Sequence, residues 1–250
     1  MRLPKDDAET LSARWIEGVL LKRDVFSTVE RGRFRGQTGE VDAVLRRLDA
    51  VPWWSYLIAR HLFARERRAL ARAKGLEVGP ELLWAGRRAL VRGFIDGVAL
   101  HLAKPRGDVA YFRSAKSALN RLHRAGICHN DLAKEQNWLV GRDSRAYLTD
   151  FQLAACFAMR SRLFRIAAYE DLRHLLEKKL SGRQSPPAAA LLFSCNGRGT
   201  RLFPEPNHDA GVIQELCGLL PLAGFFAQGE LGPVSGRNHI HGFTASVALW

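Results

Sequence analysis

The sequence is poor in several residue types, and each shortage excludes a class of protein. Its 250 residues include only four cysteines, and they stand too far apart for a paired metal-binding motif. Such spacing favours a reducing compartment over a disulfide framework. No apolar run approaches the roughly 18 residues of a membrane-spanning helix, and the first residues lead into no signal-peptide core. We therefore expect a cytoplasmic protein.

Acidic residues are scarce as well. The chain holds 25 Asp and Glu against 38 Lys and Arg, a formal net charge of +13. All of this excess lies in residues 1–182, because residues 183–250 hold four residues of each sign. A basic surface attracts anions, so we expect an anionic substrate or peripheral contact with the anionic surface of the inner membrane, with an ordinary solvated surface as the alternative. No nucleic-acid motif accompanies the charge, so no specific nucleic acid is expected as a partner.

The most informative segment is a polar loop between apolar stretches. Residues 110–125 predict a helix, and residues 138–140 and 146–148 predict two short strands. Between and after them stand Asp131, Asn137 and Asp150. Phosphoryl transfer from ATP needs a carboxylate at the acceptor hydroxyl, with an amide oxygen and a second carboxylate to hold Mg²⁺. These three residues supply those groups in that order.

The segment resembles the catalytic core of the protein-kinase-like fold, and most closely the bacterial lipopolysaccharide-kinase-like and RIO-type kinases. His129-Asn130-Asp131 replaces the family's His-Arg-Asp, and Asp150-Phe151-Gln152 replaces its Asp-Phe-Gly. The resemblance implies ATP and Mg²⁺ as cofactors and a hydroxyl of a protein, lipid or sugar as acceptor. This sequence differs from the family pattern in two ways. Asn137 follows Asp131 by six residues rather than five, and Gln152 replaces the glycine.

The resemblance also implies a role for each residue of the loop. Asp131 corresponds to the catalytic base and His129 to a residue that braces the loop. Asn137 and Asp150 correspond to the Mg²⁺ ligands. Lys134 follows Asp131 closely enough to reach the transferred phosphate.

The preceding residues predict the other half of an ATP site. Strands are expected at 20–30 and 39–48, a helix at 57–73, and two hairpin strands with a hinge at 80–84 and 88–97. By the resemblance, Arg46 stands where kinases carry the lysine that holds the α- and β-phosphates. Glu66 stands where they carry its partner, although a solvated Glu66 is an equal alternative. We expect Arg46 to approach Glu66 and Arg47 to point away, because neighbouring residues of a strand face opposite sides.

Asp171 belongs to an amphipathic helix predicted at 169–176. The resemblance implies that it is buried against the catalytic loop. An exposed carboxylate at a helix start, favourable to the helix dipole, is the alternative.

The chain changes character near residue 182, where a polar stretch with two prolines at 183–187 predicts a linker. Three segments beyond it, 191–199, 221–233 and 241–246, resemble the end of a FIST C-terminal domain, a sensory module of bacterial signal-transduction proteins that is thought to bind small ligands. We expect 191–193 and 223–227 to pair as a small sheet, because an unpaired edge is prone to association. Cys195 offers a reactive thiol, but a buried small side chain at a strand end is the favoured interpretation.

Together these patterns predict an α+β protein. Residues 1–182 would form a two-lobed kinase-like domain with a truncated C-lobe, residues 183–187 a linker and residues 188–250 a small β-rich FIST C-terminal fragment. The predicted function is an ATP-dependent phosphotransferase, similar to serine/threonine protein kinases or lipopolysaccharide kinases, fused to a sensory fragment. The alternative is a non-catalytic pseudokinase that senses a ligand through its FIST part.

Overall fold

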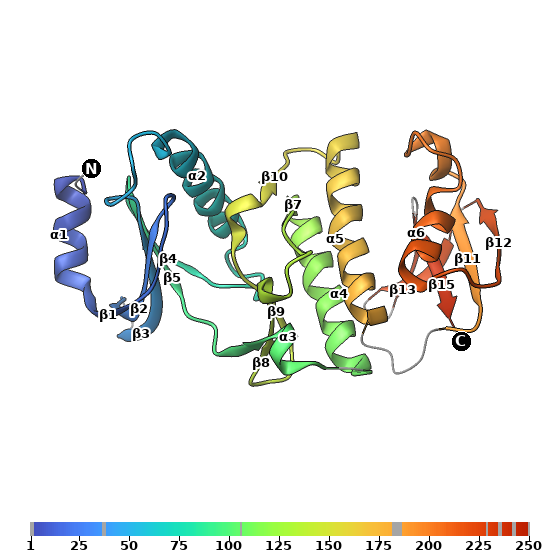
Figure 1. Cartoon of the computed structure of the whole chain (residues 1–250), viewed down its shortest axis with the longest axis horizontal. Coiled ribbons are helices and arrows are strands. Elements are labelled where there is room, and N and C mark those ends of the chain that lie inside the picture. The colour runs from blue at the N-terminus through green and yellow to red at the C-terminus, as the bar shows by residue number, and fades with distance from the viewer. Residues whose placement is uncertain are drawn as a thin grey trace. The chain divides into compact units, whose positions relative to one another are not determined.

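The computed structural model describes residues 3–36, 39–105, 107–181, 187–228, 230–234, 237–241 and 244–249, and it has a mixed α+β architecture (Figure 1). The chain divides into two compact units, Met1–Leu175 (unit 1) and Leu176–Trp250 (unit 2). The division falls inside helix α5 (Arg162–Ser181). Of the linker predicted at 183–187, only Pro187 lies within the described residues, so the predicted domain boundaries stay predictions.

Unit 1 begins with a helix and a five-stranded antiparallel sheet of order β1-β2-β3-β5-β4. The strands are β1 (Trp15–Arg23), β2 (Thr28–Arg35), β3 (Glu40–Arg47), β4 (Leu82–Ala85) and β5 (Ala89–Gly93). Alternation along the strands sends Leu45 and Val91 to one face, where they pack with Leu11 of α1 (Lys5–Arg14). Leu90 faces the other side and packs with Phe63 of α2 (Tyr56–Arg72), so the two helices lie on opposite faces (Figure 1).

The strand predicted at 20–30 is wrong, because this stretch contains a turn between β1 and β2. The side chain of Asp24 accepts hydrogen bonds from the backbone N–H groups of Phe26 and Ser27, at 2.9 and 2.8 Å. These local bonds compete with strand pairing and favour a turn. The carbonyl of Val25, in this turn, accepts a hydrogen bond from the hydroxyl of Ser55 just before α2.

The rest of unit 1 packs around helix α4. Its helices are α3 (Leu100–Ala103), α4 (Val109–Arg124) and the first part of α5, with 3₁₀ turns η1 (Glu135–Asn137) and η2 (Phe151–Leu153). Its short strands are β6 (Gly97–Ala99), β7 (Ile127–Cys128), β8 (Trp138–Gly141), β9 (Ala146–Leu148) and β10 (Ala155–Cys156). They form a β6-β8-β9 sheet and a β7-β10 pair. Buried Leu119, Leu122, Trp138 and Phe151 form the centre of one continuous core, which holds the loop between β7 and β8 in place.

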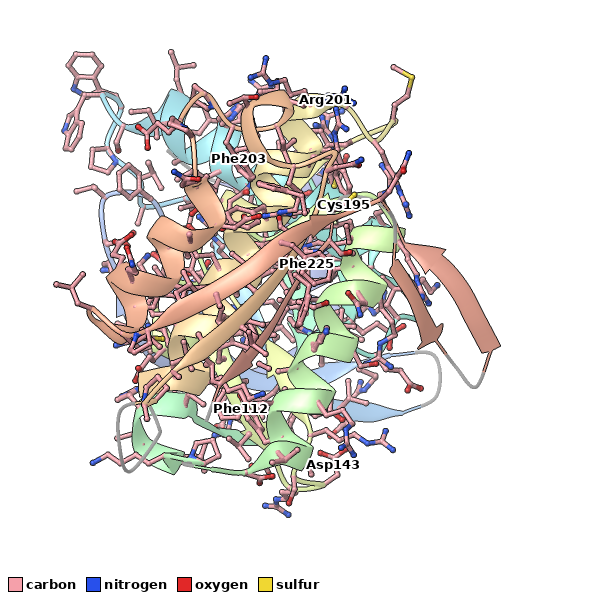
Figure 2. All side chains as sticks on the ribbon, turned by 90° about the vertical axis from the view of Figure 1, so that its right-hand side faces the viewer. Phe112, Asp143, Cys195, Arg201, Phe203 and Phe225 are labelled. Atoms are coloured by element: carbon pink, nitrogen blue, oxygen red, sulfur yellow. The ribbon has the colours of Figure 1, made fainter. Side chains whose placement is uncertain are left out.

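Unit 2 contains a β-α-β arrangement that the sequence did not reveal. Its elements are β11 (Ala190–Cys195), η3 (Gly199–Arg201), α6 (His208–Cys217), β12 (Leu222–Ala227), β13 (Glu230–Val234), β14 (Arg237–His241) and β15 (Ala245–Leu249). Strands β11 and β12 are parallel neighbours, and β15 pairs antiparallel on the other side of β11. The predicted pairing of 191–193 with 223–227 is therefore confirmed, and Cys195 is buried at the end of β11 (Figure 2). Helix α6 was not predicted. Among the described residues, no helix combines the length and apolar composition needed to cross a bilayer.

Candidate functional site

A buried carboxylate fixes the loop between β7 and β8. Asp171, from α5, accepts hydrogen bonds from the backbone N–H groups of His129 and Asn130 at 2.8 and 2.9 Å. His123 of α4 lies 3.1 Å from the same carboxylate. Asn130 has a φ of 61°, a left-handed conformation that asparagine tolerates better than most residues. Asp171 is thus a buried support for the loop in mid-helix, and the alternative of an exposed carboxylate at a helix start is wrong.

The imidazole of His129 connects this loop to the end of β9. The ring is buried, and its Nε2 lies 2.9 Å from the carbonyl oxygen of Thr149. A carbonyl can only accept, so Nε2 carries the hydrogen. Burial lowers the pKa of His129, although the charges of Asp171, Asp150 and Asp131 act in the other direction. His129 is therefore a neutral ring that spans two segments of the site, in line with the bracing role that the resemblance implied.

The next turn brings Asp131, Lys134 and Asn137 together. Nδ2 of Asn137 donates to the Asp131 carbonyl at 2.7 Å and to its carboxylate at 2.9 Å. The ammonium of Lys134 donates to the same carboxylate at 2.9 Å. That hydrogen bond raises the pKa of Lys134, and the charges of Asp131 and Asp150 add to the effect. Lys134 therefore stays protonated beside two carboxylates.

The segment between Asp131 and Asn137, which carries the extra residue, runs through η1 and is closed by the two hydrogen bonds from Asn137 to Asp131. Asn137, the buried last residue of η1, directly precedes β8, and its carbonyl accepts the N–H of Thr149 at 3.0 Å. The longer spacing is thus compatible with bringing Asn137 back to Asp131.

Asp150 follows β9 with φ 62° and ψ 66°, and its Oδ1 is buried without a hydrogen-bond partner among the described residues. A non-glycine residue in this conformation marks a position that the surrounding structure fixes. Phe151, next in the chain, is buried with its ring centroid 4.8 Å from that of His129. The free oxygen of Asp150 therefore stands at a rigid point of the chain.

A buried ion pair joins β3 to α2. The guanidinium of Arg46 donates through Nη1 to Glu66, and both side chains are almost fully buried. The Nε and Nη2 atoms of Arg46 have no hydrogen-bond partner among the described residues. Arg47 instead pairs with Glu30 and Asp49. The expected approach of Arg46 to Glu66, with Arg47 on the other face, is confirmed, whereas their role in nucleotide binding stays a prediction.

Sequence reasoning missed Arg92 of β5. Its Nε lies 3.7 Å from Oε1 of Glu66, and its Nη1 donates to the hydroxyl of Thr149 at 3.1 Å. Arg92 therefore ties α2 to the residue that precedes Asp150. The available signal was a cation directly after the apolar run Ala89-Leu90-Val91, where a strand buried on both faces would continue with an apolar residue.

One further cluster of possible metal ligands exists in unit 1. Ligand atoms of His123, Cys128 and Asp171 lie within 4.8 Å of one another. Both oxygens of Asp171 already accept hydrogen bonds from the loop. Burial raises the pKa of the Cys128 thiol, so the thiolate that metals bind is unfavourable in this environment. The cluster therefore does not fit a metal site.

Unit 2 contains a cavity of about 230 Å³ between α6 and the β11–β12 pair. Its lining includes Leu192, Ser194, His208, Asp209 and Phe225, the last of which lies on β12 (Figure 2). Its lining runs along β12 from Leu222 to Phe226 and includes residues 207–210 at the start of α6, the helix that follows β11.

A closed polar network borders this cavity. Asp209 accepts hydrogen bonds from Arg198 at 2.7 and 2.6 Å and a further one from the hydroxyl of Ser194. Burial alone would raise the pKa of Asp209, but the bonds from Arg198 and Ser194 outweigh it and hold the pKa below its ordinary value. The network therefore keeps Asp209 charged and fixes the first turn of α6.

Comparison with known proteins supports the C-terminal resemblance. Residues 137–233 match the FIST C domain family. The match begins at Asn137, well before the predicted start at 188, and ends before the motif at 241–246, of which residues 242 and 243 lie outside the described residues.

Two mycobacterial proteins are similar to part of the chain. The uncharacterised protein Rv0628c of Mycobacterium tuberculosis is 55% identical over 84 residues, which is 34% of this chain and 22% of that protein. The uncharacterised protein Mb0898c of Mycobacterium bovis is 55% identical over 83 residues, 33% of this chain and 22% of its own. The chain thus spans 22% of the length of these relatives.

Proposed function

We propose that unit 1 is an ATP-dependent phosphotransferase with an alcohol group as acceptor, built on a protein-kinase-like fold. The observation that carries the proposal is that Asn137 is hydrogen-bonded both to Asp131 and to Thr149, the residue before Asp150. Asp171 of α5 and His129, just after β7, fix this loop. The antiparallel sheet with α2 against one face supports the same fold. The acceptor class, whether protein, lipid or sugar, is left open.

The chain's own residues divide the reaction between them. The Asp131 carboxylate accepts the proton of the acceptor hydroxyl as its oxygen forms a bond to the γ-phosphorus. The bond from that phosphorus to the β,γ-bridging oxygen breaks, and its electron pair leaves with ADP. Lys134, protonated beside Asp131, offsets negative charge on the transferred group. Asn137 holds the Asp131 carboxylate in place.

The residues present fit a magnesium ion. Mg²⁺ prefers oxygen ligands and is commonly held by one or two carboxylates together with substrate phosphates. Asp150 offers a buried oxygen with no partner among the described residues, and Asn137 offers its amide oxygen from the facing segment. When bound, the ion would neutralise charge on the phosphates.

Arg46 supports a phosphate-binding role from the other side of the site. Its buried Nε and Nη2 donors lack partners among the described residues, and a guanidinium presents such donors as a fork that matches phosphate oxygens. Glu66 and Arg92 fix its position relative to Thr149. We infer that Arg46 replaces the usual lysine as the phosphate cation.

The alternative for unit 1 is a non-catalytic scaffold. Two observations favour it, namely arginine in place of lysine and a β1–β2 turn, at residues 24–27, that has no glycine to let phosphates approach the backbone. A thermal-shift measurement of the full chain with and without Mg²⁺-ATP separates the two proposals. The phosphotransferase predicts stabilisation that Asp150→Ala abolishes and that the control Asp143→Asn, at an exposed carboxylate, retains. Equal shifts in Asp150→Ala and wild type would contradict this assignment.

For unit 2 we propose a sensory, ligand-binding role in signal transduction. The FIST C domain match, which covers residues 176–233 of unit 2 and extends back over residues 137–175 of unit 1, and the cavity beside α6 support it. Ligand-observed NMR of the full chain against small aromatic and neutral polar compounds would test it. Ala210→Leu should fill the cavity and remove binding, whereas Gly211→Ala, which points into open space, should not. Binding that survives Ala210→Leu would place the ligand elsewhere.

A further inference from the structure

The start of α2 carries a cluster of exposed apolar side chains. Trp53, Trp54, Leu57 and Ile58 are 89%, 60%, 77% and 55% exposed. We refer to these four residues as the α2 tip. Scattered exposed apolar residues are ordinary, but four within six consecutive positions are a local concentration of the kind that marks an interaction surface. The opposite side of the same segment is already buried, because Ser55 and Ala59 pack against the rest of unit 1.

A row of cations follows the tip along the exposed side of the helix. It consists of Arg60, Arg67, Arg68 and Arg72 of the helix and Lys74 just beyond its end, all exposed, and we refer to it as the α2 basic row. Spacings of three, eight and four residues keep Leu57, Arg60, Arg68 and Arg72 on one side of the helix. The only acidic residue from 51 to 76 is Glu66, which is buried and paired with Arg46.

The charge of this row is not compensated locally. Within the described part of the chain, no carboxylate forms an ion pair with any residue of the basic row. The exposed side of α2 is therefore an amphipathic strip, with indole and aliphatic groups at one end and positive charge along the rest. Trp is enriched where hydrocarbon meets lipid headgroups, and Arg and Lys bind anionic headgroups.

We propose that the α2 tip and basic row dock unit 1 on an anionic lipid bilayer. Trp53, Trp54, Leu57 and Ile58 enter the boundary between headgroups and acyl chains, and the basic row lies over phosphate headgroups. Interfacial binding of this kind needs both components, since neither a small apolar patch nor a few charges suffices alone. The proposal concerns only where unit 1 binds and is independent of whether it transfers phosphate.

The observations favour lipid over a second copy of the chain. A two-fold interface uses the same patch on both copies, so it would set one basic row against another. Such like-charge contacts oppose association, and the chain has a net charge of +13. A bilayer supplies negative charge and a fluid apolar layer into which two protruding indoles fit without a preformed pocket.

Vesicle flotation of the full chain tests the proposal. We expect wild type to float with vesicles of equal parts phosphatidylcholine and phosphatidylglycerol, and not with phosphatidylcholine alone. Trp53→Ser with Trp54→Ser should weaken binding at least about tenfold, since each indole loses its burial in the boundary layer. Arg60→Ser with Arg68→Ser should weaken it by roughly fivefold per arginine and reduce its salt dependence.

Leu20→Ser with Leu21→Ser is the matched control, because these β1 residues are 53% and 56% exposed but lie outside the strip. It should bind as wild type does. Equal binding by the tryptophan double variant and wild type would overturn the proposal. So would a wild type that ignores vesicles but elutes as a dimer that the tryptophan variant converts to monomer, or one that binds a random oligonucleotide more tightly than the anionic vesicles.

Discussion

The two units each bury an arginine–carboxylate pair, but they complete it differently. In unit 2, Asp209 receives hydrogen bonds at both oxygens from Arg198 and a further one from Ser194, so the carboxylate is closed off. In unit 1, Arg46 uses only one of its nitrogens on Glu66 and leaves two buried donors without a partner among the described residues. An open donor set in a buried position is costly unless something binds it. We therefore propose that the closed pair serves the architecture and that the open one serves a ligand.

The largest effect is expected at Asp131, because a ligand bound at the open pair of unit 1 would be the substrate on which Asp131 acts. If this carboxylate takes the proton of the acceptor, Asp131→Asn should lower turnover by about 10² to 10⁴-fold, the usual contribution of a general base. ADP release in the presence of an acceptor measures the effect. Stabilisation by Mg²⁺-ATP should persist in this variant, because the proposal places the main phosphate and metal contacts on Arg46 and Asp150. Unchanged turnover in Asp131→Asn would contradict the assigned base.

The next largest effect is expected on stability, when the arginine of either buried arginine–carboxylate pair is replaced. Arg46→Met and Arg198→Met each leave a carboxylate buried without its partner, so each should lower the free energy of unfolding by about 3–5 kcal/mol. Denaturant unfolding measures the loss. Only Arg46→Met should also remove stabilisation by Mg²⁺-ATP, and Arg46→Lys should restore part of it.

Arg47→Met is the control for this pair of variants. Arg47 is partly exposed and pairs with Glu30 at the surface, so its loss should cost no more than about 1 kcal/mol. If Arg198→Met altered the response to Mg²⁺-ATP as much as Arg46→Met, the distinction between an open and a closed pair would fail.

A smaller effect is expected from acid. The pKa of His129 is lowered in the folded protein, mainly by burial, so below its ordinary value of 6.5 the unfolded chain binds a proton that the folded chain does not. Stability should therefore fall as pH drops below 6.5, by at most about 1.4 kcal/mol per pH unit until the folded pKa is reached. Thermal melting between pH 7.5 and 5.5 measures the slope. His129→Gln should flatten it, and a slope identical to that of wild type would show that other groups cause it.

The sequence predicted much of unit 1 because its elements follow local rules. The helices at 57–73 and 110–125 and the strands at 138–140 and 146–148 were found within about a residue, since apolar spacing and flanking residues set them. Segment 20–30 failed because one side chain, Asp24, makes a turn where hydrophobic pattern favours a strand. Helix α6 was missed because glycine-rich segments around it predicted turns between strands.

The residues of the candidate site were likewise predicted only in part from the sequence. Motif order alone brought out Asp131, Asn137 and Asp150 as a set, because phosphoryl transfer requires those groups. Arg92 was missed because its partners, Glu66 and Thr149, are far away in sequence. The docking strip was missed in part because exposure of Trp53 and Trp54 depends on which side of α2 the sheet covers.

What the sequence determined by itself was therefore the local elements, the uneven charge and the identity of the groups able to do chemistry. Tertiary structure decided which of those groups are paired and which are left open. Strand alternation predicted that Arg46 approaches Glu66 and that Arg47 points away, but only the packing of α2 on the sheet decided that the first pair is buried and that two donors of Arg46 lack partners among the described residues. The physical reason is desolvation, because a charge removed from water must find its partners in the fold and no local pattern specifies them.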